Sequence, residues 1–305
     1  MDFLRRHVDI ALPGFPVTPQ PRGRVRRFAV YPRGYAPVDA LIGVPEEPRG
    51  LTLQFVGFNA SLGPWEAAKL ALWASLSHTV IVTCELPGFS RYGHPLPRRV
   101  RADLLDGDPT SWAVATVACL RAAAQAGGLA APKTINVVGF SMGCSLAVAA
   151  LPAIEAVYKL DSLTLVEPVS LTSRTFGRLA INNMADLMRL LQTVPKNYPS
   201  SWVRQASLRQ LREPRLRFTA ADFLASVTML ASDDTGVRMD SIDLPVTNLA
   251  RGSSSKLCPA SQFAALDSRL TARGVPGTTA AIDDLGHDCW HCLPALDELA
   301  RTFND

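Results

Sequence analysis

Residues 134–151 join an apolar, β-branched run to a run of small residues, and residues 139–143 (Gly-Phe-Ser-Met-Gly) separate the two. The first run favours a buried strand and the second favours a closely packed helix. A strand that passes into a helix through this pentapeptide makes a sharp turn, which presents Ser141 at the carboxyl end of the strand. We expect Gly139 and Gly143 to be needed there because a Cβ would collide with the neighbouring strand or helix.

This turn gives Ser141 the surroundings of a catalytic nucleophile. The backbone N–H of Met142 lies at the N-terminus of the following helix, where it can stabilise an oxyanion. A serine hydroxyl is a weak nucleophile at neutral pH and needs a base within hydrogen-bonding distance. The pattern therefore predicts that Ser141 is a nucleophile rather than a structural turn residue.

Strand and helix patterns alternate along the chain of 305 residues. Strands are expected at residues 25–32, 38–44, 51–56, 78–84, before Ser141, and at 163–166, 246–250 and 278–282; helices are expected at 64–77, 110–126, after Ser141, and at 176–191, 201–211, 220–230, 259–273 and 293–303. Residues 1–23 and the segment between 84 and 110 are expected to be irregular. This order predicts an α/β protein with a mostly parallel, doubly wound sheet. Residues 1–170 and 244–305 would form the core, and residues 171–243 a helical insertion.

The composition is that of a folded globular protein, with 48% hydrophobic and 19% charged residues. No apolar run reaches the length of a membrane span, and no signal peptide is recognised. The net charge is +4, and the arginines near 22–27 and 98–101 have no interleaved aromatic residues, which favours a solvated surface over nucleic-acid binding. Six cysteines in a chain of this length do not indicate a disulfide framework, so a reducing, cytoplasmic location is expected.

Four segments resemble motifs of the α/β-hydrolase fold superfamily, in particular serine esterases and lipases with a helical cap, over residues 25–303. The segments are residues 54–59, 85–93, 139–143 and 285–288. They are similar to the oxyanion turn, the acidic loop after the fourth strand, the nucleophile elbow and the Gly-His loop, respectively. Two residues depart from the family pattern: Val56 replaces the histidine of the oxyanion turn, and Ser90 replaces the second glycine of the acidic loop.

The resemblance implies a general base and a second oxyanion donor. His287 follows the last strand and is preceded by a glycine, as the catalytic histidine of the family is. His291, four residues further on, is the alternative. Beside the N–H of Met142, the N–H of Phe58 is the expected second donor, or that of Asn59 one position along.

The acid of the triad is left open by the sequence. Ser255 stands at the family's usual position for the acid, after the seventh strand. The family also places the acid at the end of the sixth strand before a proline, and Glu167 fits that arrangement. Asp283 and Asp284 precede the histidine and are further candidates. The last alternative is a Ser–His pair with Ser255 as a neutral orienting group.

Residues 287–292 contain His287, Cys289, His291 and Cys292, which are residue types that bind zinc. A closed zinc site needs four ligands of compatible geometry, and these four are crowded at the start of one helix. No metal and no other cofactor is therefore expected.

These patterns together predict a serine hydrolase that cleaves a carboxylic ester or thioester through an acyl-enzyme on Ser141. The alternatives are a catalytically impaired relative that binds a ligand or partner, and an acyltransferase. Apolar side chains at helical spacing favour a substrate with an apolar acyl or aromatic group. They are Trp65, Trp73, Phe176, Met184, Leu187, Met188, Leu190 and Leu191. The sequence identifies neither the substrate nor the oligomeric state.

Overall fold

The computed structural model describes residues 5–10, 23–58, 60, 62–129, 132–193 and 216–304. The strands within these ranges are β1 (Arg5–Ile10), β2 (Gly23–Val30), β3 (Val38–Pro45), β4 (Gly50–Phe55), β5 (Thr79–Cys84), β6 (Thr134–Phe140), β7 (Lys159–Val166), β8 (Val246–Gly252) and β9 (Gly277–Ile282). The helices are α1 (Pro64–Ser77), α2 (Arg98–Leu105), α3 (Thr110–Ala126), α4 (Met142–Glu155), α5 (Phe176–Thr193), α7 (Ala220–Ser232), α8 (Thr235–Asp240), α9 (Ala260–Ala272) and α10 (Leu293–Asn304), with a 3-10 helix η2 (His287–His291).

The strands form one sheet in the order β1-β9-β8-β7-β6-β4-β5-β3-β2. β3 runs antiparallel to its neighbours β2 and β5, and the other pairs are parallel. The interior strand β5 reads Thr-Val-Ile-Val-Thr-Cys and is buried along its whole length, as expected for a strand covered on both faces. The predicted fold class, a mostly parallel sheet with helices on both faces, is confirmed.

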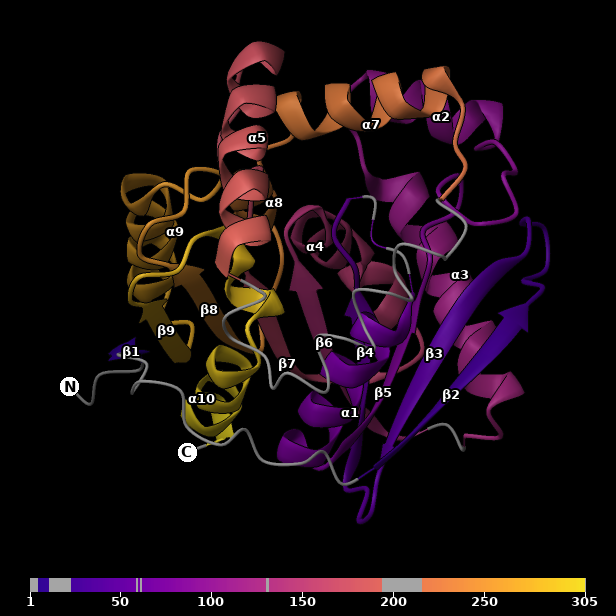
Figure 1. Cartoon of the computed structure of the whole chain (residues 1–305), viewed down its shortest axis with the longest axis horizontal. Helices are drawn as coiled ribbons and strands as arrows, with labels where there is room; N and C mark the ends of the chain where they lie inside the picture. Colours follow the sequence, from indigo (N-terminus) through magenta and orange to yellow (C-terminus); the bar gives the residue numbers. More distant parts are fainter. Residues whose placement is uncertain are drawn as a thin grey trace.

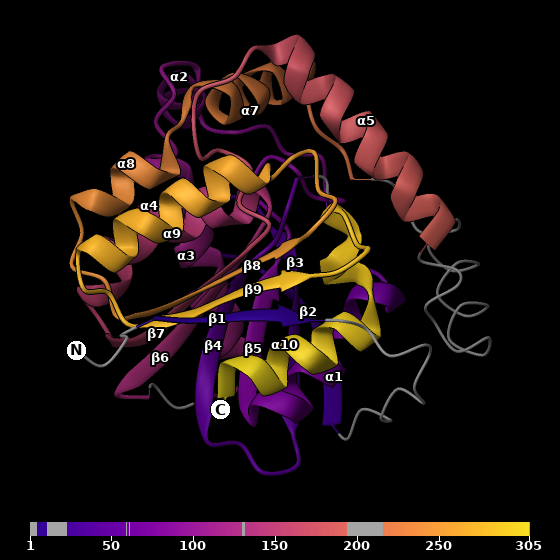
Figure 2. The ribbon, with the colours of Figure 1, turned by 90° about the vertical axis from the view of Figure 1, so that its left-hand side faces the viewer.

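Helices cover both faces of the sheet (Figure 2). α1 and α10 pack together on one face, and α3, α4, α8 and α9 lie on the other. α2, α5 and α7 lie beyond the carboxyl ends of the central parallel strands (Figure 1). The helical patterns expected at 176–191 and 220–230 are present as α5 and α7, and the one expected at 201–211 lies outside the described residues. None of the helices in the described part of the chain is long and apolar enough to span a membrane.

The structure corrects the expectation that residues 1–23 are irregular throughout. β1 pairs in parallel with β9 at one edge of the sheet. The sequence of β1 does not show the usual strand pattern, because the polar residue Arg5 stands at a buried position. The guanidinium of Arg5 donates to Asp267 Oδ1 and Thr279 Oγ1, both at 2.9 Å, and these contacts replace its hydration.

Most of the described arginines in the two clusters are exposed, as expected for a solvated surface, but one arginine in each cluster pairs with a buried carboxylate. Residues 98–105 form α2, although no helix was expected there, and bury Val100 and Leu104 on one face. Arg101 of this helix pairs with the buried Asp222 at 2.9 Å. In the other cluster, Arg27 pairs with the buried Asp39 at 2.6 Å. Arg27 and Arg101 therefore link β2 and α2 to the body of the protein.

Candidate active site

Ser141 lies between β6 and α4 with φ 57° and ψ −124°, a conformation that is strained for a residue with a Cβ. Two backbone contacts hold it: its N–H donates to Val166 O at 2.9 Å, and its carbonyl accepts from Cys144 N at 3.0 Å. The first contact continues the β6–β7 pairing and the second begins α4. The strain is therefore compensated by the elements that meet at this residue.

The glycines at 139 and 143 allow the strand and the helix to approach closely. A Cβ on Gly143 would lie 2.2 Å from the Phe55 carbonyl oxygen, and one on Gly139 would lie 2.7 Å from Cys144 Cα. Both distances are too short for a side chain. α4 consequently begins directly against the end of β4, where the turn expected to supply an oxyanion donor starts.

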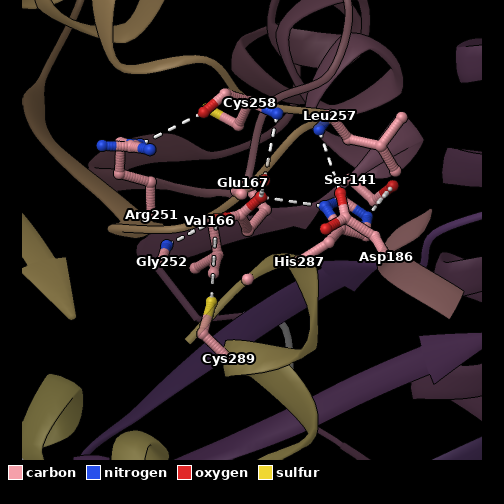
Figure 3. Close-up of polar contacts among 12 residues, drawn as sticks. Ser141, Val166, Glu167, Asp186, Arg251, Gly252, Leu257, Cys258, His287 and Cys289 are labelled. Carbon is pink, nitrogen blue, oxygen red and sulfur yellow. Dashed lines mark hydrogen bonds and ion pairs between the residues drawn. The ribbon is translucent and has the colours of Figure 1, made fainter. Parts of the chain in front are cut away.

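Ser141, His287 and Glu167 form one hydrogen-bonded chain (Figure 3). His287 Nε2 lies 2.8 Å from Ser141 Oγ, and His287 Nδ1 lies 2.9 Å from Glu167 Oε2. The Glu167 side chain is fully buried and that of His287 is 14% exposed. A carboxylate that accepts from Nδ1–H leaves the lone pair of Nε2 facing the serine hydroxyl, which is the tautomer that a general base needs.

The carboxylate of Glu167 accepts further hydrogen bonds from the loop after β8. Oε1 accepts from Gly252 N at 2.5 Å, and Oε2 accepts from the Ser255 hydroxyl at 2.6 Å as well as from His287. The Glu167 backbone has φ 56° and donates to Ala250 O at 2.8 Å, which turns the side chain toward this loop. These donors replace water around a buried negative charge.

The structure gives the other candidates for the acid and the base contacts outside the chain of Ser141, His287 and Glu167. Asp283 and Asp284 are exposed, and their backbone N–H groups donate to Ile10 O and Ser253 Oγ. His291 Nδ1 lies 3.1 Å from Lys69 Nζ. Burial and the positive charge of Lys69 lower the pKa of His291 well below its ordinary value of 6.5.

The turn after β4 packs directly against Ser141. A Cβ on Gly57 would lie 3.2 Å from Ser141 Cβ, which is closer than most Cβ contacts, so a larger residue would require Ser141 or its neighbours to shift. Phe58 is the next residue, and Met142 is the first residue of α4, whose first N–H groups have no acceptor within the helix. The two expected oxyanion donors therefore belong to segments in contact at Ser141, whereas Asn59 lies outside the described residues.

The cysteines near His287 are buried thiols. Burial raises the pKa of Cys289 well above its ordinary value and that of Cys292 to about 12, so both thiols are protonated at neutral pH. Within the part of the chain that the structure describes, no group of three or more His, Cys, Asp or Glu residues is arranged to hold a metal ion.

The apolar residues singled out in the sequence lie in different surroundings. Phe176, Met184 and Met188 on α5 are about half exposed, and Trp73 packs in the core against Trp290. The side chains of Trp65, Leu187, Leu190 and Leu191 lie outside the described parts.

A set of four aromatic rings, which the sequence analysis missed, lies next to the turn after β4. Phe58 contacts Phe89 and Phe223 with ring centroids 5.4 and 5.7 Å apart. Phe218 contacts the same two rings at 5.1 and 5.8 Å. We call these four residues the aromatic wall. Their positions show no common periodicity because they come from three separate segments of the chain.

The loop after β5 begins with a buried acid, Glu85. Its Oε2 accepts from the backbone N–H groups of Asp39 and Arg91, both at 3.2 Å. Burial, as the largest cause, raises the pKa of Glu85 from 4.5 to about 7. Glu85 thus anchors the loop that carries Phe89, and its charge state changes near neutral pH.

Replacing Glu85 with glutamine is expected to change the free energy of unfolding, relative to the wild type, more favourably above pH 7 than at pH 4. The folded protein binds more protons than the unfolded chain between pH 4.5 and about 7. The free energy of unfolding of the wild type therefore falls across this interval, and a neutral glutamine removes that loss. The free energy of unfolding of Glu85→Gln, relative to that of the wild type, should therefore increase by about 3 kcal/mol between pH 4 and pH 8.

Urea unfolding at pH 4 and pH 8 measures this change. Glu47, whose side chain is 79% exposed, provides the control, and Glu47→Gln should show no such growth. An equal stability difference between Glu85→Gln and the wild type at both pH values would contradict the prediction.

Comparison with known proteins assigns the chain to a family. The model of the alpha/beta hydrolase family matches residues 55–302. Among curated proteins the sequence has no match.

Solved structures with the same fold include three of different kinds. The thioesterase domain from the curacin biosynthetic pathway has a TM-score of 0.60 and 18% identity over 92% of this chain and 100% of that one. A bromoperoxidase from Bacillus anthracis has a TM-score of 0.58 and 13% identity, with the same coverage of 92% and 100%. An esterase from Pyrobaculum calidifontis has a TM-score of 0.52 and 19% identity over 92% and 85%. At these identities the likeness concerns the fold, and it agrees with the family match over most of the chain: the protein belongs to the alpha/beta hydrolase family.

Proposed function

We propose that this protein is a serine hydrolase that cleaves a carboxylic ester or thioester through an acyl-enzyme on Ser141. The observation that carries the proposal is the continuous chain of hydrogen bonds from Ser141 through His287 to Glu167, at 2.8 and 2.9 Å. A nucleophile, a base and a buried acid in this order are the parts that acyl transfer to a serine requires.

In the proposed reaction, Ser141 Oγ attacks the carbonyl carbon while His287 Nε2 takes the hydroxyl proton. Glu167 stabilises the imidazolium that results. The N–H groups of Met142 and Phe58 stabilise the oxyanion, each by about 3–4 kcal/mol. His287 then donates its proton to the leaving alcohol or thiol. Water then attacks the acyl-enzyme with His287 again as base, and His287 returns the proton to Ser141 Oγ as the carboxylic acid leaves. These steps use only side chains, backbone N–H groups and water.

We further propose that the described helices α5 and α7 of residues 171–243 form a cap over this site, whereas α8, at the end of the segment, packs against α4. α5 and α7 belong to this segment and lie beyond the carboxyl ends of the central strands, the edge at which Ser141 is presented (Figure 1). Ligands of open parallel sheets bind at this edge. A substrate would therefore reach Ser141 between these helices and the sheet.

The aromatic wall favours a substrate with an apolar acyl group, which these rings would bind. Phe58 combines an expected oxyanion donor with a ring of this wall, so the rings lie beside the place where the carbonyl would bind. Phe58 and Phe223 are half-buried, and Phe218 is 39% exposed. These rings therefore have surface available for a ligand and would gain from covering it.

Replacing Phe223 with alanine is expected to weaken the preference for longer acyl chains. Removing the ring deletes apolar contact worth about 1–3 kcal/mol, so kcat/KM for p-nitrophenyl hexanoate should fall about tenfold or more. The acetate ester does not reach the wall, and its kcat/KM should change less than threefold. The control is the adjacent Leu224→Ala, at a side chain that is 57% exposed. An equal loss for both esters would contradict an acyl-binding role.

A fluorophosphonate probe tests the proposed function directly. It reacts with a serine only where a base and an oxyanion site activate the hydroxyl. We expect a covalent adduct on the peptide that contains Ser141, located by mass spectrometry. If Ser141 stays unmodified while a control serine hydrolase reacts, the proposal is wrong, and a relative that only binds a ligand becomes the better interpretation.

A further inference from the structure

The loop between Gly252 and Cys258 fixes the orientation of the Glu167 carboxylate. Ser255 Oγ accepts from Cys258 N at 3.1 Å, which turns the hydroxyl proton of Ser255 toward Glu167 Oε2, 2.6 Å away. This is the same oxygen that accepts from His287 Nδ1. A displacement of the loop would therefore move the oxygen that holds the imidazole.

Helix α5 holds the loop on the other side. Asp186 Oδ2 accepts from the N–H groups of Lys256 and Leu257, at 3.2 and 3.0 Å. One turn earlier, Asn182 Nδ2 donates to Lys256 O at 3.0 Å, and Arg174, which precedes the helix, donates to Leu257 O at 2.7 Å.

Asp186 is buried, whereas most of the other described side chains of α5 are exposed. Its residue is 4% exposed, whereas Ile181 and Met184 on the same helix are 71% and 58% exposed. A carboxylate is costly to bury unless donors surround it. Asp186 thus forms a specific contact with the loop rather than a general surface contact.

We propose that Asp186 is a positioning residue that acts on Glu167 through the 252–258 loop and the hydroxyl of Ser255. This inference rests on the proposed function for its effect on the reaction. In this proposal, the position of helix α5 determines the orientation of the Glu167 carboxylate toward His287. A substrate that moves α5 would change the triad geometry as well as the opening of the site.

Proton NMR tests the positioning without any enzymatic activity. A proton held between His287 Nδ1 and a buried carboxylate gives a far-downfield resonance, which Glu167→Gln should remove and so assign. We expect Asp186→Ala and Ser255→Ala to shift or broaden this resonance. The control Asp234→Ala removes a similar carboxylate contact to a backbone N–H, at the start of α8, and should leave the resonance unchanged.

A double-mutant cycle in kcat then separates positioning from general structural support. Asp186→Ala and Ser255→Ala should each lower kcat for p-nitrophenyl acetate about tenfold, with KM within twofold of the wild type. If Asp186 acts through Ser255, the double variant should be no slower than Ser255→Ala alone. Asp186→Asn keeps one acceptor oxygen and should recover part of the rate, and it replaces the alanine variant if that one does not fold.

The possible failures are distinguishable. An unchanged downfield resonance in Asp186→Ala, or losses in kcat that multiply in the double variant, would overturn the positioning role. A wild-type protein that neither turns over esters nor reacts with the fluorophosphonate would overturn the proposed function, and the resonance would still decide whether Asp186 orients Glu167.

Discussion

Replacing Ser141 with alanine is expected to lower kcat for ester hydrolysis by about a millionfold and to abolish labelling by a fluorophosphonate. The variant loses the only atom that the proposed mechanism acylates. His287 and Glu167 cannot compensate, because in that mechanism they serve only to move and stabilise the serine proton. Hydrolysis of p-nitrophenyl acetate under excess enzyme measures the residual rate.

Ser145 offers a matched control on the same helix. It is buried one turn after the nucleophile, and its hydroxyl pairs with Thr235 Oγ1 at 2.9 Å. Ser145→Ala removes a hydroxyl from α4 and should keep most of the activity. Circular dichroism should show that both variants are folded. A Ser141→Ala protein that retains more than about a hundredth of the wild-type rate would exclude Ser141 as the nucleophile.

Replacing Glu167 with glutamine is expected to lower kcat by about ten thousandfold with little change in KM. Four donors face the carboxylate: Gly252 N, the Ser255 hydroxyl, His287 Nδ1 and, at 4.0 Å, the Cys289 thiol. Glutamine has a single oxygen, so at least one of these donors must face an NH2 group. When the NH2 group faces His287, it favours the tautomer with the proton on Nε2, which cannot accept the proton of Ser141.

The carboxylates closest to His287 in sequence are the controls. Asp283 and Asp284 are exposed, so Asp283→Asn and Asp284→Asn should keep kcat within about twofold of the wild type. A loss as large as that of Glu167→Gln in either variant would assign the acid to that position instead. Steady-state kinetics on all three variants with one ester decide between them.

The fold could be predicted largely from local patterns. The helices at 64–77 and 110–126 have the predicted bounds, because helical spacing and their neighbouring turns are local properties of the sequence. β1 was missed for a reason that is not local. The polar Arg5 is buried in this edge strand because Asp267, which is 262 positions away, and Thr279 accept from its guanidinium.

The candidate site divides in the same way. The elbow around Ser141 and the Gly-His loop at His287 are short motifs in which a few adjacent residues determine the backbone, so the sequence by itself determined these two candidates. It could not choose the acid, because that choice depends on contacts across the sheet. Only the tertiary structure decided that Glu167 faces His287, that Ser255 and Asp186 support it, and that the aromatic wall gathers beside Phe58. The physical reason is that hydrogen bonds and ring contacts act over a few ångströms of space, whatever the distance along the chain.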